Sequence, residues 1–475
     1  MDDMNNRIIP VAEETVDFEV QRDRRIDEMT VLLEEKKMKQ LRLVLDENDE
    51  FEVAEFLTEL PDNQMAMVFR MLSKEQAAAV FAELDPEEQE YIINSITDKE
   101  LGGILDELYL DDTVDMMEEL PANVVKRVMR IATPETRKLV NQYLRYPENS
   151  AGSIMTAEFV DLKKYMNVKE SFARIRRIGA DKETIYTCFV TSADRKLEGI
   201  VSVKDLLLAN EDAVIGDIMD ENVVFCTTTD DQEDVSGLFT DYNLLAVPVV
   251  DKENRLVGIV TVDDVMDVME QEATEDIEIM AAITPSDKPY SRTGVFDIWK
   301  NRFPWLLLLM LSATFTSMIL TSFEDALAVQ AALIAFIPML MGTGGNSGSQ
   351  ASTAVIRSLS LGDIEPGDVF LVIWKEIRVA ALCGFTLAVI NFGKLFLVDR
   401  LLLGNDGVTI TIALTVCVTI FFVIVFAKAV GCTLPIVAEK VGIDPAVMAA
   451  PLISTLTDAI SLLIYFAIAK LLLHI

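Results

Sequence analysis

The sequence predicts a multidomain protein: an acidic α-helical superhelical domain and a tandem pair of α/β modules, followed by a membrane domain of five α-helices. Three observations predict this arrangement. Residues 1–291 carry about −35 of the net charge of −36 on the 475 residues, two stretches repeat 59 residues apart, and five long apolar runs follow Arg302. An acidic half of this kind repels nucleic acid and attracts cations, so we expect no nucleic-acid partner.

The apolar runs after Arg302 predict membrane-spanning helices. Each run is near the ~20 residues that a helix needs to cross a bilayer core. Trp299 and Trp305 flank the first run, as aromatic residues do at a membrane interface. We therefore expect a multi-pass protein of the plasma membrane, in contact with the lipid bilayer. The five expected spans are Phe303–Leu320, Ala326–Gly342, Val379–Val398, Val408–Phe426 and Ala446–Leu473.

Loop charge predicts the orientation of these spans, because basic residues favour the cytoplasmic side. Basic residues precede the first span and lie between the second and third spans and between the fourth and fifth. The soluble half is therefore expected in the cytoplasm and the C-terminus outside. Lys394 and Arg400 fall on the outer side and oppose this pattern. The residues that carry the prediction are Lys288, Arg292, Lys300, Arg302, Arg357, Lys375, Arg378, Lys428 and Lys440.

A glycine-rich element, Pro338–Gln350, interrupts the second span with the letters PMLMGTGGNSGSQ. Such backbone is tolerated in a membrane where protein or a water-filled cavity covers it. Glycine also permits close packing of helices. The sequence leaves both interpretations open, a packing face and a pore lining, and makes Gly345 and Asn346 candidate pore residues.

Asp458 interrupts the last span near the middle of the bilayer. A carboxylate at that depth costs several kcal/mol unless it faces water, a cation or a partner, and no basic residue lies within a turn of it. Ser454, Thr455 and Thr457 add oxygen atoms nearby. Oxygen ligands suit hard cations, and Mg²⁺ keeps most of its water when it binds. We therefore predict that Asp458 binds a hydrated divalent cation in a pore that Ser454 also lines.

The internal repeat pairs the stretch from Gly199 to Asp205 with the stretch from Gly258 to Asp264. Each copy follows an apolar strand and a charged turn, and each precedes a helix. Upstream, the letters SIMT beginning at Ser153 match DIMD beginning at Asp217. The repeating unit is predicted as strand–helix–strand–strand–helix.

A second periodicity precedes the repeat, where an apolar residue recurs every 12 residues from Leu60 to Leu120. A helix-start signal follows each one, at Pro61, Ser73, Asp85, Thr97, Asp111 and Pro121. Helices of about two turns bury their apolar faces only by stacking on neighbours. The pattern predicts a helical solenoid.

The segment Asp263–Glu278 holds eight carboxylates and no basic residue. Asp111 and Asp115 form a further like-charged pair at helical spacing. These groups act either as a solvated face or as a cation sensor. The candidate sensor residues are Asp111, Asp115, Asp264, Asp267, Glu272, Glu275 and Asp276. The sequence shows no nucleophile–base pair, phosphate-binding loop or zinc signature. We therefore do not expect an enzyme.

The doubled G-h-h-[ST]-x-x-D pattern resembles a tandem pair of CBS domains. That resemblance implies that Ser202, Asp205, Thr261 and Asp264 contact the ribose and phosphates of an adenine nucleotide such as ATP. The alternative is a pair that only dimerises and binds nothing.

Nearly the whole chain resembles the MgtE family of magnesium channels. Its marks are the Gly-Gly-Asn-x-Gly-x-Gln element Gly344–Gln350, and Asp444-Pro-Ala with Pro451 and Asp458. The resemblance implies a homodimer whose pore lies on the two-fold axis, lined by spans two and five, with Asp458 holding a hydrated Mg²⁺. It also implies that Glu270–Arg302 forms an amphipathic connecting helix that plugs the pore.

The expected domains follow from the resemblance. They are an acidic helical-repeat domain (1–148), a CBS pair (149–269, divided into about 149–211 and 212–269), a connecting helix (270–302) and a transmembrane domain (303–475). The expected function is a Mg²⁺ channel gated by cytoplasmic Mg²⁺, with ATP as a candidate modulator. An ion-coupled divalent-metal carrier and a non-conducting membrane-anchored sensor of nucleotide or ions remain as alternatives.

Overall fold

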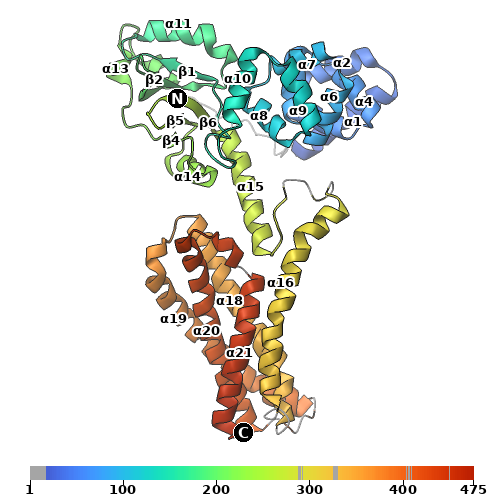
Figure 1. Cartoon of the computed structure of the whole chain (residues 1–475), viewed down its shortest axis with the longest axis vertical. Coiled ribbons are helices and arrows are strands. Elements are labelled where there is room, and N and C mark those ends of the chain that lie inside the picture. The colour runs from blue at the N-terminus through green and yellow to red at the C-terminus, as the bar shows by residue number, and fades with distance from the viewer. Residues whose placement is uncertain are drawn as a thin grey trace, which may run out of the picture. The chain divides into compact units, whose positions relative to one another are not determined.

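The computed structural model describes residues 18–286, 290, 293–324, 330–402, 404, 407, 409–448 and 450–474. The chain divides into two compact units, Met1–Val268 and Met269–Ile475, each with its own apolar core (Figure 1). The predicted basic residues Lys288 and Arg292, and residues 326–329 of the second expected span, lie outside the described part of the chain.

Short helices form the beginning of the first unit, as the 12-residue periodicity predicts. From α3 onward, each helix packs mainly on helices two positions away, so that α5 contacts α7, α7 contacts α9, and α6 contacts α8. This stacking is the predicted solenoid. Its helices are α1 (Phe18–Glu34), α2 (Met38–Glu47), α3 (Glu50–Thr58), α4 (Asp62–Phe69), α5 (Lys74–Ala82), α6 (Pro86–Ser95), α7 (Asp98–Leu105), α8 (Leu110–Glu119), α9 (Ala122–Ile131) and α10 (Pro134–Tyr143).

Local capping explains where these helices begin. The Ser73 hydroxyl accepts the backbone N–H of Gln76, and the Thr97 side chain forms a capping box with Glu100. Five of the six predicted starts are N-cap residues. The expectation that α8 begins at Asp111 is wrong, because Tyr109 is its N-cap and Asp111 lies in its first turn.

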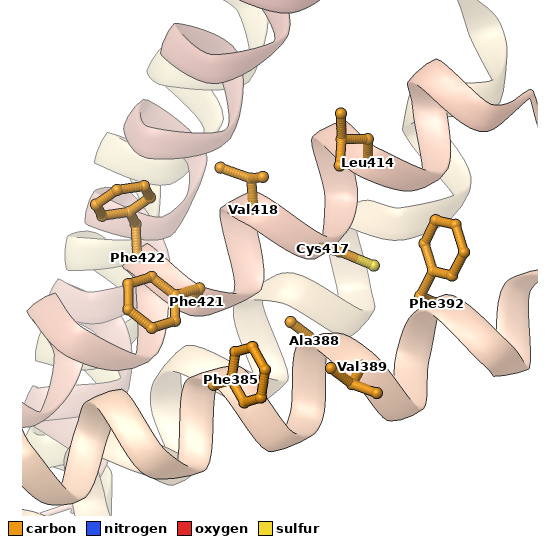
Figure 2. A pocket seen from close by; sticks show the side chains of 9 residues that line it. All are labelled: Phe385, Ala388, Val389, Phe392, Leu414, Cys417, Val418, Phe421 and Phe422. Atoms are coloured by element: carbon orange, nitrogen blue, oxygen red, sulfur yellow. The ribbon is translucent and has the colours of Figure 1, made fainter.

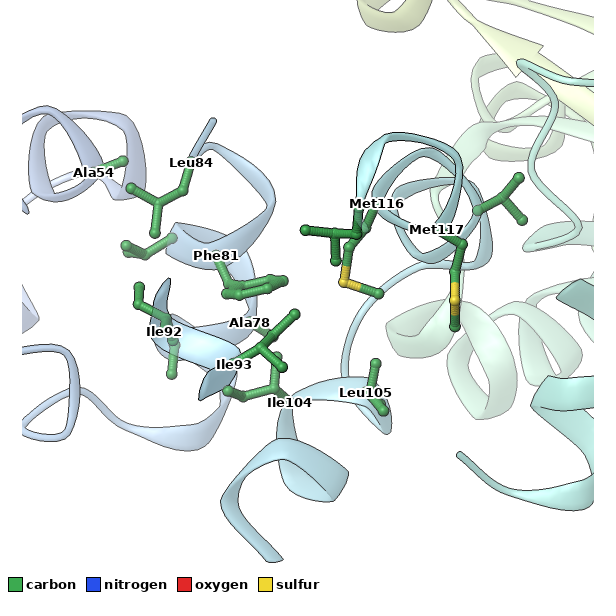
Figure 3. Packing of buried hydrophobic residues seen from close by; sticks show 14 of the residues in the cluster. Ala54, Ala78, Phe81, Leu84, Ile92, Ile93, Ile104, Leu105, Met116 and Met117 are labelled. Atoms are coloured by element: carbon green, nitrogen blue, oxygen red, sulfur yellow. The ribbon is translucent and has the colours of Figure 1, made fainter. Parts of the chain in front are cut away.

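Apolar side chains from successive turns form a continuous core through the solenoid. Figure 3 shows Phe81 beside Ala78 and Ile93, facing the helix that carries Met116. The rings of Phe69 and Phe81 meet edge to face, with their centroids 6.3 Å apart.

The repeated α/β modules follow α10, and both have the predicted strand–helix–strand–strand–helix order. In each module the first and second strands pair in parallel, and the second and third strands form an antiparallel hairpin. The strand orders are therefore β1-β2-β3 and β4-β5-β6. The strands are β1 (Phe159–Leu162), β2 (Thr184–Thr191), β3 (Leu197–Ser202), β4 (Cys226–Thr227), β5 (Ala246–Val250) and β6 (Leu256–Thr261); the helices are α11 (Val168–Ile178), α12 (Val203–Leu208), α13 (Ile215–Ile218), α14 (Gln232–Tyr242) and α15 (Val262–Met280).

Close backbone approach explains the repeated glycine of the two modules. A methyl group on Gly199 would lie 2.8 Å from the Asp220 carbonyl oxygen, and one on Gly258 would lie 2.8 Å from that of Thr156. Asp220 pairs with the strand at Ile200, just as Thr156 pairs with the other strand at Ile259. The two matched upstream segments therefore pack in equivalent ways, each on the strand of the other module.

The membrane unit contains five long helices among its described residues. Four spans are long and apolar enough to cross a bilayer by length and composition: Val295–Ser322, Pro366–Leu402, Ile410–Val441 and Pro445–Leu473. The fifth long helix, α18, carries the glycine-rich element. The helices are α16 (Val295–Ser322), α18 (Ile337–Ser360), α19 (Val369–Lys394), α20 (Ile410–Val441) and α21 (Ala450–Leu473).

The second expected span is placed too early in the sequence. A 3₁₀-helix occupies Ala331–Phe336, and α18 then runs from Ile337 through the glycine element to Ser360. Pro338 lies in the first turn of α18, where its missing N–H and fixed φ are tolerated. Hydropathy misplaces this span because α18 is rich in small residues of low hydropathy, many of which are buried.

The expected connecting helix, Glu270–Arg302, is not one continuous helix. Its first part belongs to α15, which ends at Met280; Ala282 then takes a left-handed φ of 55°, and Pro285 follows. The residues from Val295 belong to α16, with Gly294 as the N-cap. Proline disfavours helix in the residue before it, which accounts for the break.

Lys428 does not lie in a loop, as the orientation argument assumed. It lies inside α20, is 7 % exposed, and its Nζ is 3.4 Å from Oε2 of Glu376 on α19. The pair compensates two charges that would each be costly alone within the helix bundle. Lys375 and Arg378 likewise lie on α19 instead of in a loop.

Candidate functional site

Glycines of α18 allow close packing on α20 and α21. A methyl group on Gly345 would meet the Ser454 hydroxyl at 2.9 Å, and one on Gly348 would meet Ile453 at 2.7 Å. A methyl group on Gly431 of α20 would overlap the carbonyl oxygen of Gly348. The packing interpretation therefore holds for Gly345, which is buried within the chain against the predicted pore residue Ser454.

Asn346 and Asp458 are more open than the glycines beside them. Asn346 is exposed, and Asp458 is half-buried and makes no hydrogen bond or ion pair with any described residue. Ser454 precedes Asp458 by one helical turn on α21. A hydroxyl, an amide and a single carboxylate thus lie along neighbouring parts of α18 and α21. So few ligands per chain suit a cation that keeps most of its water.

Sequence reasoning missed one polar residue beside this group. The Ser461 hydroxyl is buried without a hydrogen-bond partner among the described residues. A methyl group on Gly344 would overlap it. Ser461 looks like an ordinary helix-interior serine in the sequence, so nothing there marked it.

A second group of carboxylates lies where α8 of the solenoid meets the α/β pair, within the first unit. Asp111 is 8 % exposed, and its Oδ1 has no hydrogen-bond partner among the described residues. Burial, then the charges of Asp112, Asp264 and Glu183, raise the pKa of Asp111 to about 9. Burial, then Asp112 and Glu118, raise the pKa of Asp115 to about 7.

The other carboxylates of this cluster have the same character. Burial raises the pKa of Asp112 to about 6, with Asp264 as the leading charge. Burial raises the pKa of Glu183 to about 7, again with Asp264 as the leading charge. Burial also raises the pKa of Asp264 to about 6, although hydrogen bonding from Thr261 opposes the change. We call Asp111, Asp112, Asp115, Glu183 and Asp264 the acidic cluster.

The acidic cluster does not form a tight metal-binding shell. Among the described residues, no three His, Cys, Asp or Glu side chains are gathered closely enough to hold a metal ion. The carboxylates interact as charges spread over two domains. Such a group suits hydrated cations that bridge through water, or protons, and disfavours a dehydrated ion.

Asp276 near the end of α15 lies against the membrane helices of the second unit. Burial, then the charge of Asp444, raises the pKa of Asp276, while a hydrogen bond from the Ser360 hydroxyl at 3.4 Å opposes the change. Ile279 and Met280 pack with Ile356 and Ala446 in the same unit. The predicted sensor residue Asp276 and the motif residue Asp444 are therefore two like charges close to each other.

The remaining sensor candidates lie along α15. Asp267 is the leading charge that raises the pKa of the half-buried Glu83, after burial. Glu272 adds to the raised pKa of Asp276. Glu275 is partly exposed beside Asp276. The structure thus distributes the predicted sensors between the acidic cluster and the part of α15 beside the membrane helices.

The predicted nucleotide residues form local hydrogen bonds in both modules. The Ser202 hydroxyl donates to Oδ2 of Asp205 at 2.5 Å, and the Thr261 hydroxyl donates to Oδ2 of Asp264 at 2.5 Å. Ser202 also caps α12 by accepting the Asp205 N–H at 3.0 Å. The motif therefore has a structural role as a helix cap. Only the second copy lies in the acidic cluster.

Fold and site together define a membrane-integral cation transport protein with large acidic soluble domains. Three family models match the chain: a divalent cation transporter model named MgtE at 337–468, the MgtE intracellular N domain at 48–149, and the CBS domain at 215–271. The chain belongs to the MgtE family of magnesium transporters, so the resemblance seen in the sequence is confirmed.

Curated relatives and a solved structure agree with this assignment. The magnesium transporter MgtE of Thermus thermophilus is 40% identical over 369 residues, which are 77% of this chain and 80% of that protein. MgtE of Bacillus subtilis is 31% identical over 383 residues, 81% of this chain and 83% of that protein. The soluble part of a magnesium transporter has a TM-score of 0.50 at 28% identity, covering 53% of this chain and 99% of that one.

Proposed function

We propose that this protein is a Mg²⁺ channel of the plasma membrane that closes when cytoplasmic Mg²⁺ is high. Two groups of carboxylates have no compensating cation among the described residues, one in the membrane unit and one in the soluble unit. These two groups support the proposal. Asp458 makes no ion pair with a described residue of the membrane unit, and the acidic cluster crowds five carboxylates at the junction of the soluble domains. The soluble half then lies in the cytoplasm and the C-terminus outside.

The pore forms between two copies of the chain in this proposal. Asn346, Ser454 and Asp458 line it, so a dimer places two carboxylates on the two-fold axis. Two carboxylates neutralise one divalent cation. Since each chain supplies few ligands, the ion passes with most of its water. Gly345 and Gly348 act indirectly, by holding α18 close against α20 and α21.

Gating follows from repulsion that Mg²⁺ converts to attraction. At low Mg²⁺ the acidic cluster resists the compact arrangement, since its members are buried and raise one another's pKa values. Bound Mg²⁺ bridges carboxylates from different domains. Only an ion that binds the compact state more tightly than the open state shifts this equilibrium. Asp276 and Asp444 supply the matching pair beside the membrane helices.

ATP is a candidate modulator at Ser202 with Asp205 and at Thr261 with Asp264. The two copies are electrostatically different. Phosphates near Asp264 face Asp112 and Glu183, so a nucleotide binds there only with a cation that compensates its charge. Mg²⁺ and nucleotide are therefore coupled ligands in this proposal, and each changes the affinity for the other by the same factor.

One observation favours an ion-coupled carrier as the second candidate. The buried Lys428–Glu376 pair adds titratable groups to the membrane unit, beyond Asp458. A carrier that exchanges protons for Mg²⁺ needs such groups to change protonation in its cycle. A channel uses the same pair only to hold α19 against α20.

Ion flux into liposomes containing the purified full-length protein separates these functions. We expect passive uptake of Mg²⁺ above that of Co²⁺, Ca²⁺ and Na⁺, without movement of protons. Proton movement at a fixed ratio to Mg²⁺ supports the carrier instead. Absence of any ion flux leaves a non-conducting sensor.

A further inference from the structure

An apolar groove lies between α19 and α20 on the membrane unit, away from the glycine-rich face of α18. Its volume is about 420 Å³, within the ~300–1,000 Å³ range of small-molecule sites. Figure 2 shows Ala388 and Val389 of α19 lying between Phe385 and Phe392, with Phe421 on the facing helix. Among the described residues that line it, Cys417 is the only one whose side chain carries a heteroatom.

The groove is open along its length. Phe385 is 67 % exposed, and Leu414 on the facing helix is 48 % exposed. Ala388 provides little side-chain volume between the two phenylalanines of α19. The amide of Asn391 is turned inward, where it donates to Sγ of Cys417 at 3.8 Å. The groove surface is therefore apolar, and it suits a flexible hydrocarbon chain.

A basic end continues the same face of α19. Arg378 precedes Phe385 by seven residues, which is two helical turns and about 10 Å along the axis. Arg378 is exposed, and its guanidinium carbon lies 5.9 Å from the ring centroid of Trp374. An aromatic ring beside a basic residue is typical of a membrane–water interface. The exposed Lys375 adds a second positive charge nearby.

The nearest carboxylate does not oppose an anion there. Glu376 follows Lys375, but its Oε2 lies 3.4 Å from the buried Nζ of Lys428 on the inner side of α19. Glu376 is therefore paired on the inner side, whereas Lys375 and Arg378 are exposed. An apolar groove about two turns from an exposed arginine matches an amphiphile with a hydrocarbon tail and an anionic head.

We propose that the groove between α19 and α20 binds one acyl chain of an anionic phospholipid whose phosphate lies against Arg378. The binding site is distinct from the general lipid boundary, because it joins a recessed apolar surface to a fixed positive charge. Anionic lipid is abundant in the cytoplasmic leaflet, the side where the charge pattern of the sequence places this end of α19.

Native mass spectrometry of the full-length protein tests the proposal. The delipidated protein is titrated with phosphatidylglycerol or phosphatidylcholine of the same acyl composition. The wild type is expected to bind one phosphatidylglycerol per chain more tightly than phosphatidylcholine. Arg378→Gln should weaken phosphatidylglycerol binding about fivefold and leave phosphatidylcholine unchanged. Lys440→Gln, on an exposed residue in the last turn of α20, is the matched control and should change neither lipid.

Filling the groove provides the second variant. Ala388→Phe should remove the tight site for both lipids while the mass of the oligomer stays the same. Two results overturn the proposal. The first is an unchanged preference for phosphatidylglycerol in Arg378→Gln, which decides the matter even if Ala388→Phe does not fold. The second is a change of oligomeric state in Ala388→Phe without loss of lipid, which makes the groove an interface between copies of the chain.

Discussion

Replacing Asp111 with Asn tests whether the acidic cluster opposes the compact form of the soluble half. The substitution keeps the shape of the side chain and removes its charge. The pKa of Asp111 in the folded wild type is about 9, against an ordinary value of 3.8. At pH 8 the folded protein therefore holds a proton on Asp111 that the unfolded chain has released. At ~1.4 kcal/mol per pH unit, four units correspond to a penalty on the order of 6 kcal/mol.

The sign of the pH dependence follows from the raised pKa. Between about pH 4 and pH 9 the folded state binds more protons than the unfolded state, so wild-type stability falls as pH rises through this window. Asp112, Asp115, Glu183 and Asp264 contribute in the same direction over the lower part of the window. Asp111→Asn removes the largest contribution, so its advantage should be absent near pH 4 and should grow with pH up to about pH 9.

Thermal unfolding of the soluble half without Mg²⁺ measures the effect. The wild type relieves part of this penalty when the solenoid separates from the α/β pair. We therefore expect Asp111→Asn to gain about 3 kcal/mol in free energy of unfolding, or about 6–12 °C in Tm for a unit of this size. Added Mg²⁺ should stabilise the wild type more than Asp111→Asn. The control is Asp212→Asn, an exposed aspartate away from the cluster, which should change Tm little at any pH.

Two results would refute the reasoning about the acidic cluster. One is a lower Tm for Asp111→Asn than for the wild type at pH 8 without Mg²⁺. The other is the same difference between the two proteins at pH 5 and pH 8, which would mean that packing or hydrogen bonding of Asp111, and not its ionisation, determines the effect.

The other predictions concern the pore, the gate and the nucleotide. Asp458→Ala should abolish or misdirect divalent flux in liposomes with expression and oligomeric state intact, because it removes the carboxylate of α21; normal Mg²⁺ flux contradicts the assignment. Glu275 and Asp276 replaced together by Ala should leave the channel open at millimolar Mg²⁺, because the substitution removes carboxylates that the ion bridges in the closed state, and this loss outweighs the relief of ~0.2–0.5 kcal/mol of repulsion per like-charged pair; closure as in the wild type places the sensor elsewhere. Calorimetry of residues 1–275 with ATP, ADP and AMP should record heat that Asp264→Ala reduces; no heat at millimolar nucleotide leaves the CBS pair as a dimerisation device. Millimolar Mg²⁺ should protect the soluble half from protease; equal protection by monovalent salt at the same ionic strength would rule out bridging.

Local signals in the sequence predicted most of the solenoid and the α/β pair. Ser73 and Thr97 start helices through hydrogen bonds to residues three positions on, which any reader of the sequence can anticipate. The repeated glycines at 199 and 258 lie where the backbone of one module closely approaches a strand of the other module. Asp111 was expected to start a helix because aspartate is a common N-cap residue, but α8 begins earlier, with Tyr109 as its N-cap.

Tertiary contacts explain what the sequence did not reveal. Glu183 joins the acidic cluster although it is about 70 residues from Asp112, and neither has a local pattern that marks it. Lys428 looked like a loop cation, but its partner Glu376 lies on another helix. Hydropathy placed the second span too early, since it cannot distinguish glycine buried against a helix from glycine in a loop.

Currents through the full-length protein in a planar bilayer, with Mg²⁺ varied on the side of the soluble half, test the central claim most directly. We expect Mg²⁺ currents far faster than carrier turnover at low Mg²⁺ on that side, with open probability falling steeply as Mg²⁺ enters the millimolar range. Currents that are absent, or an open probability that does not respond to Mg²⁺ on that side, would contradict it.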